Sequence, residues 1–318
     1  MPRKGLKGYM PCYYPLSAVK TEDGNIKFNP RSGEGDLMKL PCGQCMGCRI
    51  DRSRMWAVRC MHEASQFEKN CFITLTYAPE HLPKNGDLHY EHFQKFMKRL
   101  RKANQNQNIR FYMCGEYGDE FKRPHFHAIL FNYDFKDKYE HKVNHNGDIV
   151  YRSPHLESLW PFGHSTVGTA TETSAAYVAR YVTQKATGRI QDINPKTGEP
   201  YREIYYRGTD PESGERIYVK PEFNKMSLKP GIGQNWFDKY YQDVYPSDSV
   251  RLRDGRRIKP PRYYDKKYDA IEPYEFEAIK QNRILNALKH SDESSPERLA
   301  VKETVLMAKI QKLKRNLQ

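Results

Sequence analysis

Two histidines and a glutamate form the strongest chemical signal in the sequence. His125 and His127 are separated by Phe126 in a segment rich in strand-forming residues. Residues i and i+2 of a β-strand face the same side, so both imidazoles can bind one divalent ion while Phe126 packs on the other side. Glu116 lies on the preceding strand candidate, across the short polar turn 118–124, and a hairpin would bring it beside the histidines. Two imidazoles and one carboxylate with open coordination positions make a common type of catalytic metal site.

A second set of reactive side chains follows at helical spacing. Tyr177, Tyr181 and Lys185 are four residues apart and share one face of a helix predicted over 172–186. A tyrosine stripe often packs into a core, but a lysine at the same phase is unusual there. A tyrosine hydroxyl, with a pKa of about 10, is a poor nucleophile at neutral pH. A nearby metal ion or ammonium favours its phenolate, which can attack phosphorus.

The elements that must position these side chains can be read from hydrophobic periodicity. Strands are predicted by strand-forming residues and helices by apolar residues at three- and four-residue spacing, with a polar loop over 134–154. The order predicts an α+β core over 51–190, with a central mainly antiparallel sheet flanked by helices. The predicted strands are 71–77, 109–117, 125–133 and 165–168, and the predicted helices are 51–69, 90–103, 156–159 and 172–186.

Three further regions flank this core. Residues 1–50 are predicted to be an irregular, cysteine-rich segment. Residues 191–270 form a hairpin-rich extension that is basic and rich in tyrosine, with turns at 194–199, 210–215 and 254–255. Residues 271–318 are predicted to be a basic helical region that is interrupted at 291–296.

The cysteines of the first region have metal-ligand spacing. Cys42, Cys45 and Cys48 form a C-x-x-C-x-x-C cluster, and Cys12 can supply a fourth thiolate for a tetrahedral structural zinc site. Cys60 is an alternative fourth ligand, although it falls in a predicted helix. An iron–sulfur cluster and three reduced thiols in a glycine-containing turn are the other interpretations.

Charge and composition indicate a polyanionic partner. Lys and Arg number 53 against 39 Asp and Glu, a net charge of +14, and nucleic acid is the commonest partner of such a surplus. An acidic membrane surface is the competing explanation, but no apolar run approaches the roughly 18 residues of a membrane span. The N-terminus lacks a secretory signal, and the odd number of cysteines argues against a disulfide framework. We therefore expect a cytosolic protein without a membrane partner.

One basic stretch is interleaved with tyrosines and is a candidate surface for single-stranded DNA, because cations can bind phosphates and rings can stack on bases. Its members are Arg251, Arg253, Arg256, Arg257, Lys259, Arg262, Tyr263 and Tyr264. No Gly-rich Walker loop is present, so a built-in helicase is not expected.

Several segments, taken together and in order, resemble the HUH endonucleases of rolling-circle replication, and most closely the replication initiators of microviruses, especially the gokushovirus branch. The resemblance covers about residues 40–240, and no single motif would suffice for it. The segments are PCGQCMGCR (41–49), FITLTY (72–77), CGEYG (114–118), RPHFHAILF (123–131), YVARYVTQK (177–185) and MSLKPGIG (226–233).

The resemblance implies a role for each group. His125, His127 and Glu116 would bind Mg²⁺ or Mn²⁺, and Tyr177 and Tyr181 would be alternating nucleophiles. One tyrosine would nick the viral origin, leaving a 5′-phosphotyrosine and a free 3′-hydroxyl that primes a host polymerase. The other would cut the regenerated origin, and strand transfer would release circular single-stranded DNA in the host cytoplasm, with a host helicase unwinding the duplex. Many single-tyrosine relatives carry a lysine three residues after the nucleophile, whereas here Lys185 is four residues after Tyr181.

Other functions compete with this one. The chain could be a non-catalytic, zinc-containing DNA-binding or packaging protein, in which case the tyrosine stripe is core. A metallohydrolase built on the His-x-His pair would need further Asp or His ligands at later strand ends, and would leave the charge of +14 unexplained. A plasmid initiator or transposase of the same superfamily is a neighbouring alternative, against which the cysteine cluster and the paired tyrosines argue.

Overall fold

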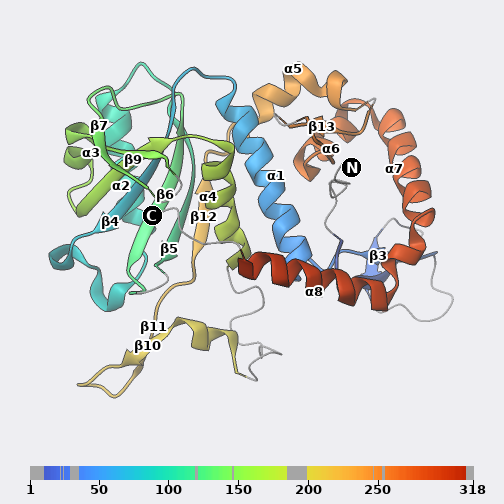
Figure 1. Cartoon of the computed structure of the whole chain (residues 1–318), viewed down its shortest axis with the longest axis horizontal. Helices are drawn as coiled ribbons and strands as arrows, with labels where there is room; N and C mark the ends of the chain where they lie inside the picture. Colours follow the sequence, from blue (N-terminus) through green and yellow to red (C-terminus); the bar gives the residue numbers. More distant parts are fainter. Residues whose placement is uncertain are drawn as a thin grey trace. The chain divides into compact units, whose positions relative to one another are not determined.

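The computed structural model describes residues 11–21, 23, 25–28, 36–118, 121–144, 147–184, 199–245, 247–252 and 255–312. The chain divides into two compact units (Figure 1). We call Trp56–Lys239 the sheet unit, and Met1–Met55 together with Tyr240–Arg315 the cysteine unit. The division falls inside α1 (Met46–Ala64) and inside α5 (Gln234–Val244).

A seven-stranded sheet, ordered β12-β5-β6-β4-β9-β8-β7, forms the centre of the sheet unit. Every neighbouring pair in it is antiparallel, which confirms the predicted α+β class. Its strands are β4 (Asn70–Tyr77), β5 (Arg110–Tyr117), β6 (Pro124–Phe131), β7 (Tyr139–Val143), β8 (Ile149–Arg152), β9 (Gly163–Thr169) and β12 (Phe223–Met226).

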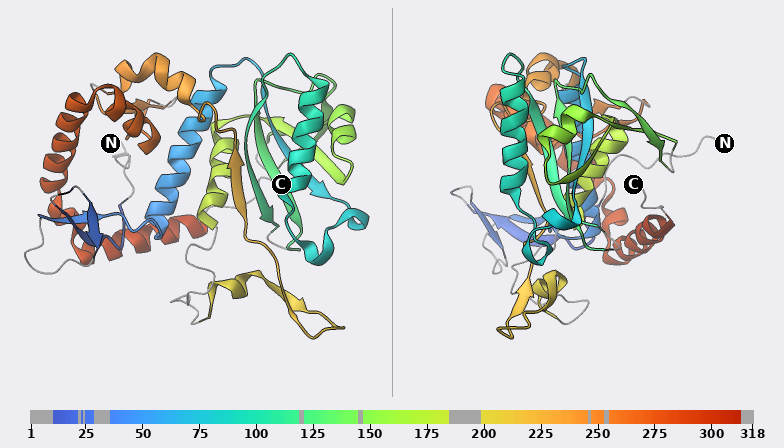
Figure 2. Two further views of the ribbon diagram at one scale, coloured as in Figure 1. Left: turned by 180° about the vertical axis from the view of Figure 1, so that it is seen from behind. Right: turned by 90° about the vertical axis from the view of Figure 1, so that its left-hand side faces the viewer.

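Helices cover both faces of this sheet. Along β4, alternate side chains such as Ile73 and Leu75 are fully buried against α2 (Tyr90–Ala103) and α3 (Pro154–Leu159). Figure 2 shows α2 standing against one side of the strands. The opposite face packs on the C-terminal half of α1 and on α4 (Glu172–Gln184). The two-residue period of β4 therefore separates an apolar core face from the face that carries the histidines.

A small hairpin projects from the sheet unit. It consists of β10 (Tyr206–Thr209) and β11 (Arg216–Tyr218), preceded by the 3₁₀ turn η3 (Tyr201–Tyr205) (Figure 1). Its turn, 210–215, is one of the turns expected from the sequence. The expected turn over 194–199 lies outside the described residues apart from Glu199.

The cysteine unit contains a sheet that the sequence did not predict. Strands β1 (Leu16–Lys20), β2 (Ile26–Phe28) and β3 (Asp36–Leu40) pair in the order β2-β1-β3, so the expectation of an irregular segment over 1–50 was wrong. The reason is that all three β2 side chains are exposed, which leaves no hydrophobic alternation to detect.

The C-terminal part of the cysteine unit matches the expected hairpin and interrupted helices. A hairpin of β13 (Val250–Arg251) and β14 (Arg257–Ile258) spans the turn predicted at 254–255, of which Gly255 is described and Asp254 lies outside the described residues. Helices α6 (Arg262–Ile271), α7 (Pro273–Leu288) and α8 (Pro296–Lys312) follow, with the 3₁₀ turn η4 (Ser291–Ser294) before α8.

The predicted loop over 134–154 was also wrong, because it contains β7 and β8. All five β7 side chains are exposed, and β8 is no more than half-buried. Neither strand shows the apolar-polar alternation that identifies a half-buried strand. Both extend the sheet beyond β9, beside the histidine-bearing face.

Candidate functional site

The register of three strands brings Glu116, His125 and His127 together. Glu116 of β5 is paired with His125 of β6, and His127 is paired with Thr74 of β4. The Nε2 atoms of His125 and His127 lie 2.5 Å and 3.0 Å from Glu116 Oε1. One ligand atom from each residue lies within 4.8 Å of the others, and all three residues are buried. We call this set the Glu-His-His cluster.

Each histidine is oriented by a hydrogen bond at its other ring nitrogen. His125 Nδ1 lies 3.0 Å from the backbone oxygen of Arg123, and His127 Nδ1 lies 2.9 Å from Thr74 Oγ1. These bonds fix the ring orientation so that both Nε2 atoms face the same Glu116 oxygen. Such outer partners fix the tautomer and ring angle of metal-binding histidines. Sequence reasoning recognised Thr74 as part of a motif but gave it no role, because the bond depends on strand register.

The electrostatics of the cluster suit a cation. Burial raises the pKa of Glu116, but hydrogen bonds from His125 and His127 outweigh it, so that its pKa lies below the ordinary value. Burial lowers the pKa of His127 and favours the neutral imidazole. Glu116 Oε2 is buried without a hydrogen-bond partner in the described part of the chain. An ionised carboxylate with an unsatisfied oxygen beside two imidazole nitrogens fits a divalent metal ion.

Helix α4 places Tyr177 against this cluster. The Tyr177 hydroxyl lies 3.5 Å from His127 Nε2, and its ring meets the His127 ring edge to face with centroids 5.0 Å apart. The Phe72 ring stacks on the His127 ring, with centroids 5.5 Å apart, and also contacts the Tyr177 ring edge to face. Reciprocal hydrogen bonds between Thr171 and Ser174 cap the start of α4.

The other two residues of the predicted tyrosine face are less fully described. Tyr181 lies on α4 one turn after Tyr177, and its side chain is outside the described residues. Lys185 is also outside them. The structure thus brings together Glu116, His125, His127 and Tyr177 of the predicted site.

The four predicted zinc ligands also converge, in the cysteine unit. Cys12, Cys42, Cys45 and Cys48 have sulfur atoms within 4.8 Å of one another, and Cys12 Sγ lies 3.9 Å from Cys45 Sγ. Four thiolates held 2.3 Å from zinc in a tetrahedron are separated by about 3.8 Å. Cys60, the alternative ligand, is instead fully buried beside the sheet.

Backbone N–H groups point at these sulfurs. Cys42 Sγ accepts from the N–H groups of Gln44 and Cys45, and Cys45 Sγ accepts from those of Cys48 and Tyr13. Burial raises the pKa of Cys42, but these N–H groups and the neighbouring thiols bring it below its ordinary value. Leu299 and Leu306 of α8 pack against the cysteines, so the cluster ties the chain's N-terminal segment to α8.

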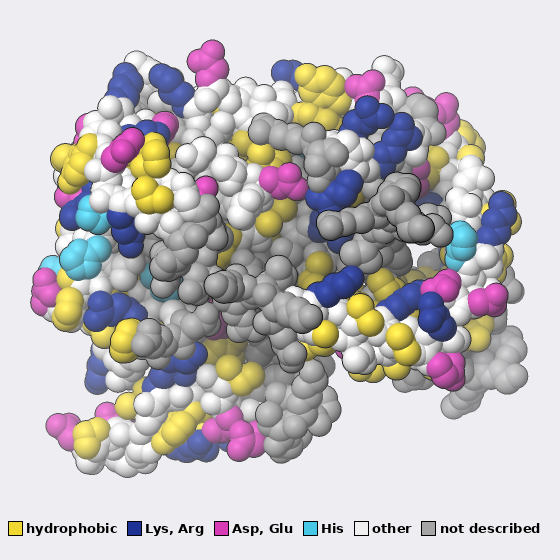
Figure 3. Space-filling model, in the orientation of Figure 1, with side chains coloured by type: hydrophobic (Ala, Val, Ile, Leu, Met, Phe, Trp, Pro, Cys, Tyr) yellow, Lys and Arg dark blue, Asp and Glu magenta, His cyan; other side chains and the backbone are white. Residues whose placement is uncertain are grey.

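The predicted DNA-binding stretch is split by the fold. Arg251, Arg256, Arg257, Lys259 and Arg262 are exposed, while Arg253 lies outside the described residues. Figure 3 shows Lys and Arg side chains gathered over the region of β13 and α6. Tyr263 is half-buried, but Tyr264 is fully buried, so stacking of Tyr264 on a base was a wrong expectation. Its ring belongs to the core on the inner face of α6.

The MSLKPGIG motif is anchored by a buried ion pair that sequence reasoning missed. Glu63 Oε1 lies 2.5 Å from Arg110 Nε, and Glu63 Oε2 accepts from the N–H of Gly233. Arg110 donates to the Pro230 carbonyl, and Arg59 donates to that of Ile232. The network joins residues more than 100 positions apart, so the local sequence of α1 did not identify it.

The antiparallel sheet, the Glu-His-His cluster and the helix-borne tyrosine define an α+β protein with a candidate metal centre beside a tyrosine hydroxyl. Residues 70–186 match the family described as Replication-associated protein ORF2/G2P, and that segment contains the whole cluster and Tyr177. No helix in the described part of the chain has the length and apolar character that a membrane crossing requires.

Individual relatives extend the match beyond this segment. The chain is 33% identical to Replication-associated protein VP4 of Bdellovibrio phage phiMH2K, over 83% of this chain and 79% of the relative. It is 31% identical to Replication-associated protein ORF2 of Spiroplasma virus 4, over 86% of each, and 39% identical to Replication-associated protein ORF4 of Chlamydia phage 1, over 71% and 52%. No solved structure matches. The chain belongs to this family of phage replication-associated proteins.

Proposed function

We propose that the chain initiates rolling-circle DNA replication as a metal-dependent endonuclease that nicks single-stranded DNA through a tyrosine. The observation that carries the proposal is the Tyr177 hydroxyl, 3.5 Å from a nitrogen of the Glu-His-His cluster. Tyrosine is a poor nucleophile unless a neighbouring charge favours its phenolate. A purely structural stripe would not need the unsatisfied carboxylate oxygen of Glu116.

In the proposed reaction the Tyr177 oxygen attacks phosphorus and gives up its proton. The bond from phosphorus to the 3′-oxygen breaks, that oxygen takes up a proton, and the DNA is left joined through its 5′-phosphate to the tyrosine. Glu116, His125 and His127 would hold Mg²⁺ or Mn²⁺, which would neutralise charge on the phosphodiester. Thr74 and the Arg123 carbonyl orient the two histidines, and Phe72 keeps the Tyr177 ring in place.

The remaining predicted residues complete the cycle. Tyr181, on the same helix, would make the second cut, and attack by the free 3′-hydroxyl on the phosphotyrosine would close the circle and restore the tyrosine. Lys185 would assist at the same site. The substrate would be viral origin DNA in the host cytoplasm, with a host polymerase extending the 3′-hydroxyl and a host helicase opening the duplex.

The test is the covalent product. Purified protein is incubated with labelled single-stranded DNA from the origin region, with and without Mn²⁺, and resolved on a denaturing gel. We expect a metal-dependent protein–DNA adduct that is lost in Tyr177→Phe/Tyr181→Phe and in His125→Ala/His127→Ala. Folded protein that binds this DNA but never forms an adduct would indicate the non-catalytic DNA-binding alternative.

We further propose that Arg251, Arg256, Arg257, Lys259 and Arg262 contact DNA.

We also propose that the four cysteines bind structural zinc. The sulfur spacing and the N–H donors support zinc. Purified protein should contain one zinc per chain, and Cys45→Ser should remove it together with stability, because ligation of this kind contributes directly to folding. Metal analysis showing iron would instead indicate an iron–sulfur cluster.

A further inference from the structure

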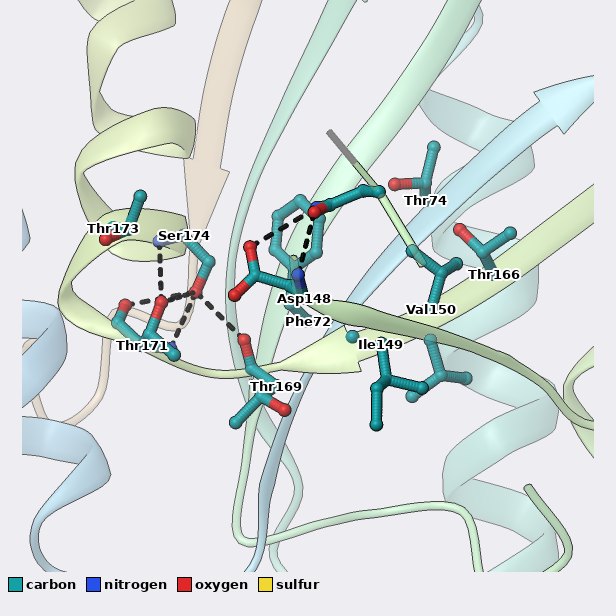
Figure 4. Close-up of a pocket in the computed structure, with 13 residues that line it drawn as sticks. Phe72, Thr74, Asp148, Ile149, Val150, Thr166, Thr169, Thr171, Thr173 and Ser174 are labelled. Atoms are coloured by element: carbon teal, nitrogen blue, oxygen red, sulfur yellow. Dashed lines mark hydrogen bonds between the residues drawn. The ribbon is translucent and has the colours of Figure 1, made fainter. Parts of the chain in front are cut away.

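A pocket of about 90 Å³ lies beside the Glu-His-His cluster on the same face of the sheet. Thr74, which hydrogen-bonds His127, and Phe72, which stacks on it, both line this pocket. The register places Thr166 of β9 next to Thr74. The start of α4 and the β7–β8 hairpin complete the wall (Figure 4).

The lining combines flat apolar surface with acceptors and hydroxyls. Phe72, Ile149 and Val150 offer apolar surface, and Thr166 and Thr169 offer hydroxyls. Figure 4 shows Asp148 close to Phe72, with Thr74 and Thr166 on the other side. Asn144 donates to the Asp148 carboxylate and also binds its backbone, which holds Asp148 in place.

The charge of the side chains that line the pocket indicates whether it would bind the base or the phosphate of a nucleotide. Among the described residues that line the pocket, Asp148 is the one acidic residue, and none is Lys or Arg. A carboxylate repels phosphate but accepts hydrogen bonds from a base edge. Hydroxyls and an aromatic ring likewise suit the edge and the face of a base. The pocket therefore fits a base rather than the backbone.

We propose that this pocket binds one unpaired base of the single strand, adjacent to the phosphodiester that Tyr177 attacks, and that Asp148 selects guanine. The proposal rests on the proposed nicking function. Guanine presents two neighbouring donors, N1–H and N2–H₂, which match the two oxygens of a carboxylate. Adenine, cytosine and thymine place an acceptor next to their donor and so meet Asp148 less well.

The location makes this base part of origin recognition at the reaction centre. The pocket shares Thr74 with the hydrogen bond that orients His127, and it shares α4 with Tyr177. A base held here fixes the position of its neighbouring phosphate relative to the tyrosine. Positioning of this kind is the main contribution that a protein makes when the reacting groups are already activated.

The experiment selects DNA by binding alone. A pool of random-sequence single-stranded 20-mers is equilibrated with the full-length protein in EDTA, and the bound fraction is sequenced. We expect the wild type to enrich guanine at one position, and Asp148→Asn and Thr166→Val to reduce that enrichment about tenfold, the size of one good base contact. Glu140→Gln is the matched control, because it removes the same charge from an exposed site in the same hairpin.

A guanine preference that persists unchanged in Asp148→Asn, or a wild type without base preference, would overturn the pocket assignment. Both variants alter side chains without an apolar core role, and circular dichroism and thermal melting verify that they are folded. The same proteins are assayed for the Mn²⁺-dependent adduct. A wild type that forms the adduct but shows no base preference refutes the pocket only, whereas a wild type that selects guanine but forms no adduct refutes the nicking function only.

Discussion

The Thr74 hydroxyl can influence metal binding indirectly, through its hydrogen bond to His127. Its Oγ1 lies 2.9 Å from His127 Nδ1, opposite the nitrogen that faces Glu116. We expect Thr74→Val to weaken Mn²⁺ binding about 10- to 100-fold, because the ring loses the bond that fixes its tautomer and angle. Thr74→Ser, which keeps the hydroxyl, should restore most of the affinity. Isothermal titration with Mn²⁺ measures both, and equal affinities for Val and Ser would show that Thr74 only fills space.

His62 gives the sheet unit a sensitivity to mild acid. Its ring stacks on Trp236 with centroids 3.4 Å apart, and burial lowers its pKa to about 3. Below about pH 6.5 the unfolded chain binds a proton at His62 that the folded chain does not. The free energy of unfolding therefore decreases as the pH is lowered.

The expected loss attributable to His62 is about 1–2 kcal/mol between pH 6.5 and 5. Urea denaturation at both pH values should show a smaller acid loss in His62→Gln than in the wild type. His164→Gln, at an exposed histidine on β9, should behave like the wild type. An identical pH dependence in His62→Gln and the wild type would contradict the assignment.

Residue types predicted the members of the candidate sites better than they predicted which side chains are buried. The proximity of Glu116, His125 and His127, and that of Cys42, Cys45 and Cys48, follows from spacing, because a hairpin and a short turn bring nearby residues together, whereas Cys12 joins its cluster from 30 residues away. Thr74 needed the pairing of β4 with β6, which joins residues 53 apart. Tyr264 could not be assigned from type, because tyrosine serves both surfaces and cores.

At the scale of elements, the Glu63–Arg110 pair holds the segment after β12 against α1 and β5. The side chains of the pair are 2% and 4% exposed, so removing one partner leaves a buried charge. We expect Glu63→Gln to lower the free energy of unfolding by about 3–5 kcal/mol. Glu303→Gln, at a carboxylate bonded to the Tyr14 hydroxyl in an exposed pair, should cost far less. Denaturant titration distinguishes these, and a loss below about 1 kcal/mol in Glu63→Gln would contradict the role.

Elements with a buried face were predicted closely, and exposed elements were not. The strong amphipathic pattern of 90–103 and the alternation of β4 mark those elements correctly. Strands β2 and β7 are short and fully exposed, β8 is at most half-buried, and β1 buries only two adjacent residues, so these strands are specified by pairing with neighbours rather than by their own hydrophobic pattern. A turn at 254–255 was predicted from residue types alone, but the two short strands of the β13–β14 hairpin were not.

For the whole molecule, the net charge of +14 predicts a strong dependence of DNA affinity on salt. Arg251 and Arg257 are paired across the β13–β14 hairpin and are exposed. If each contacts a phosphate, Arg251→Gln/Arg257→Gln should reduce the slope of log K against log salt by about 1.4 for single-stranded DNA.

The matched control is Arg298→Gln/Lys302→Gln, because it removes the same charge from two cations that share an ion pair with Glu293. Fluorescence anisotropy over a salt series measures the slopes. A slope that falls equally in the two double variants would mean that net charge, and not the hairpin, determines binding.

The three candidate metal ligands come from one hairpin, which sets the order in which the parts of the site come together during folding. Glu116 and His127 are 11 residues apart in the chain, whereas Tyr177 meets His127 across 50. Contacts between near neighbours cost little loop-closure entropy and form first. A chain that is still being made therefore completes its ion-binding hairpin before α4 exists. On the proposed function, nicking requires Tyr177 as well as the hairpin, so we expect a chain that lacks α4 to bind the ion without cutting DNA.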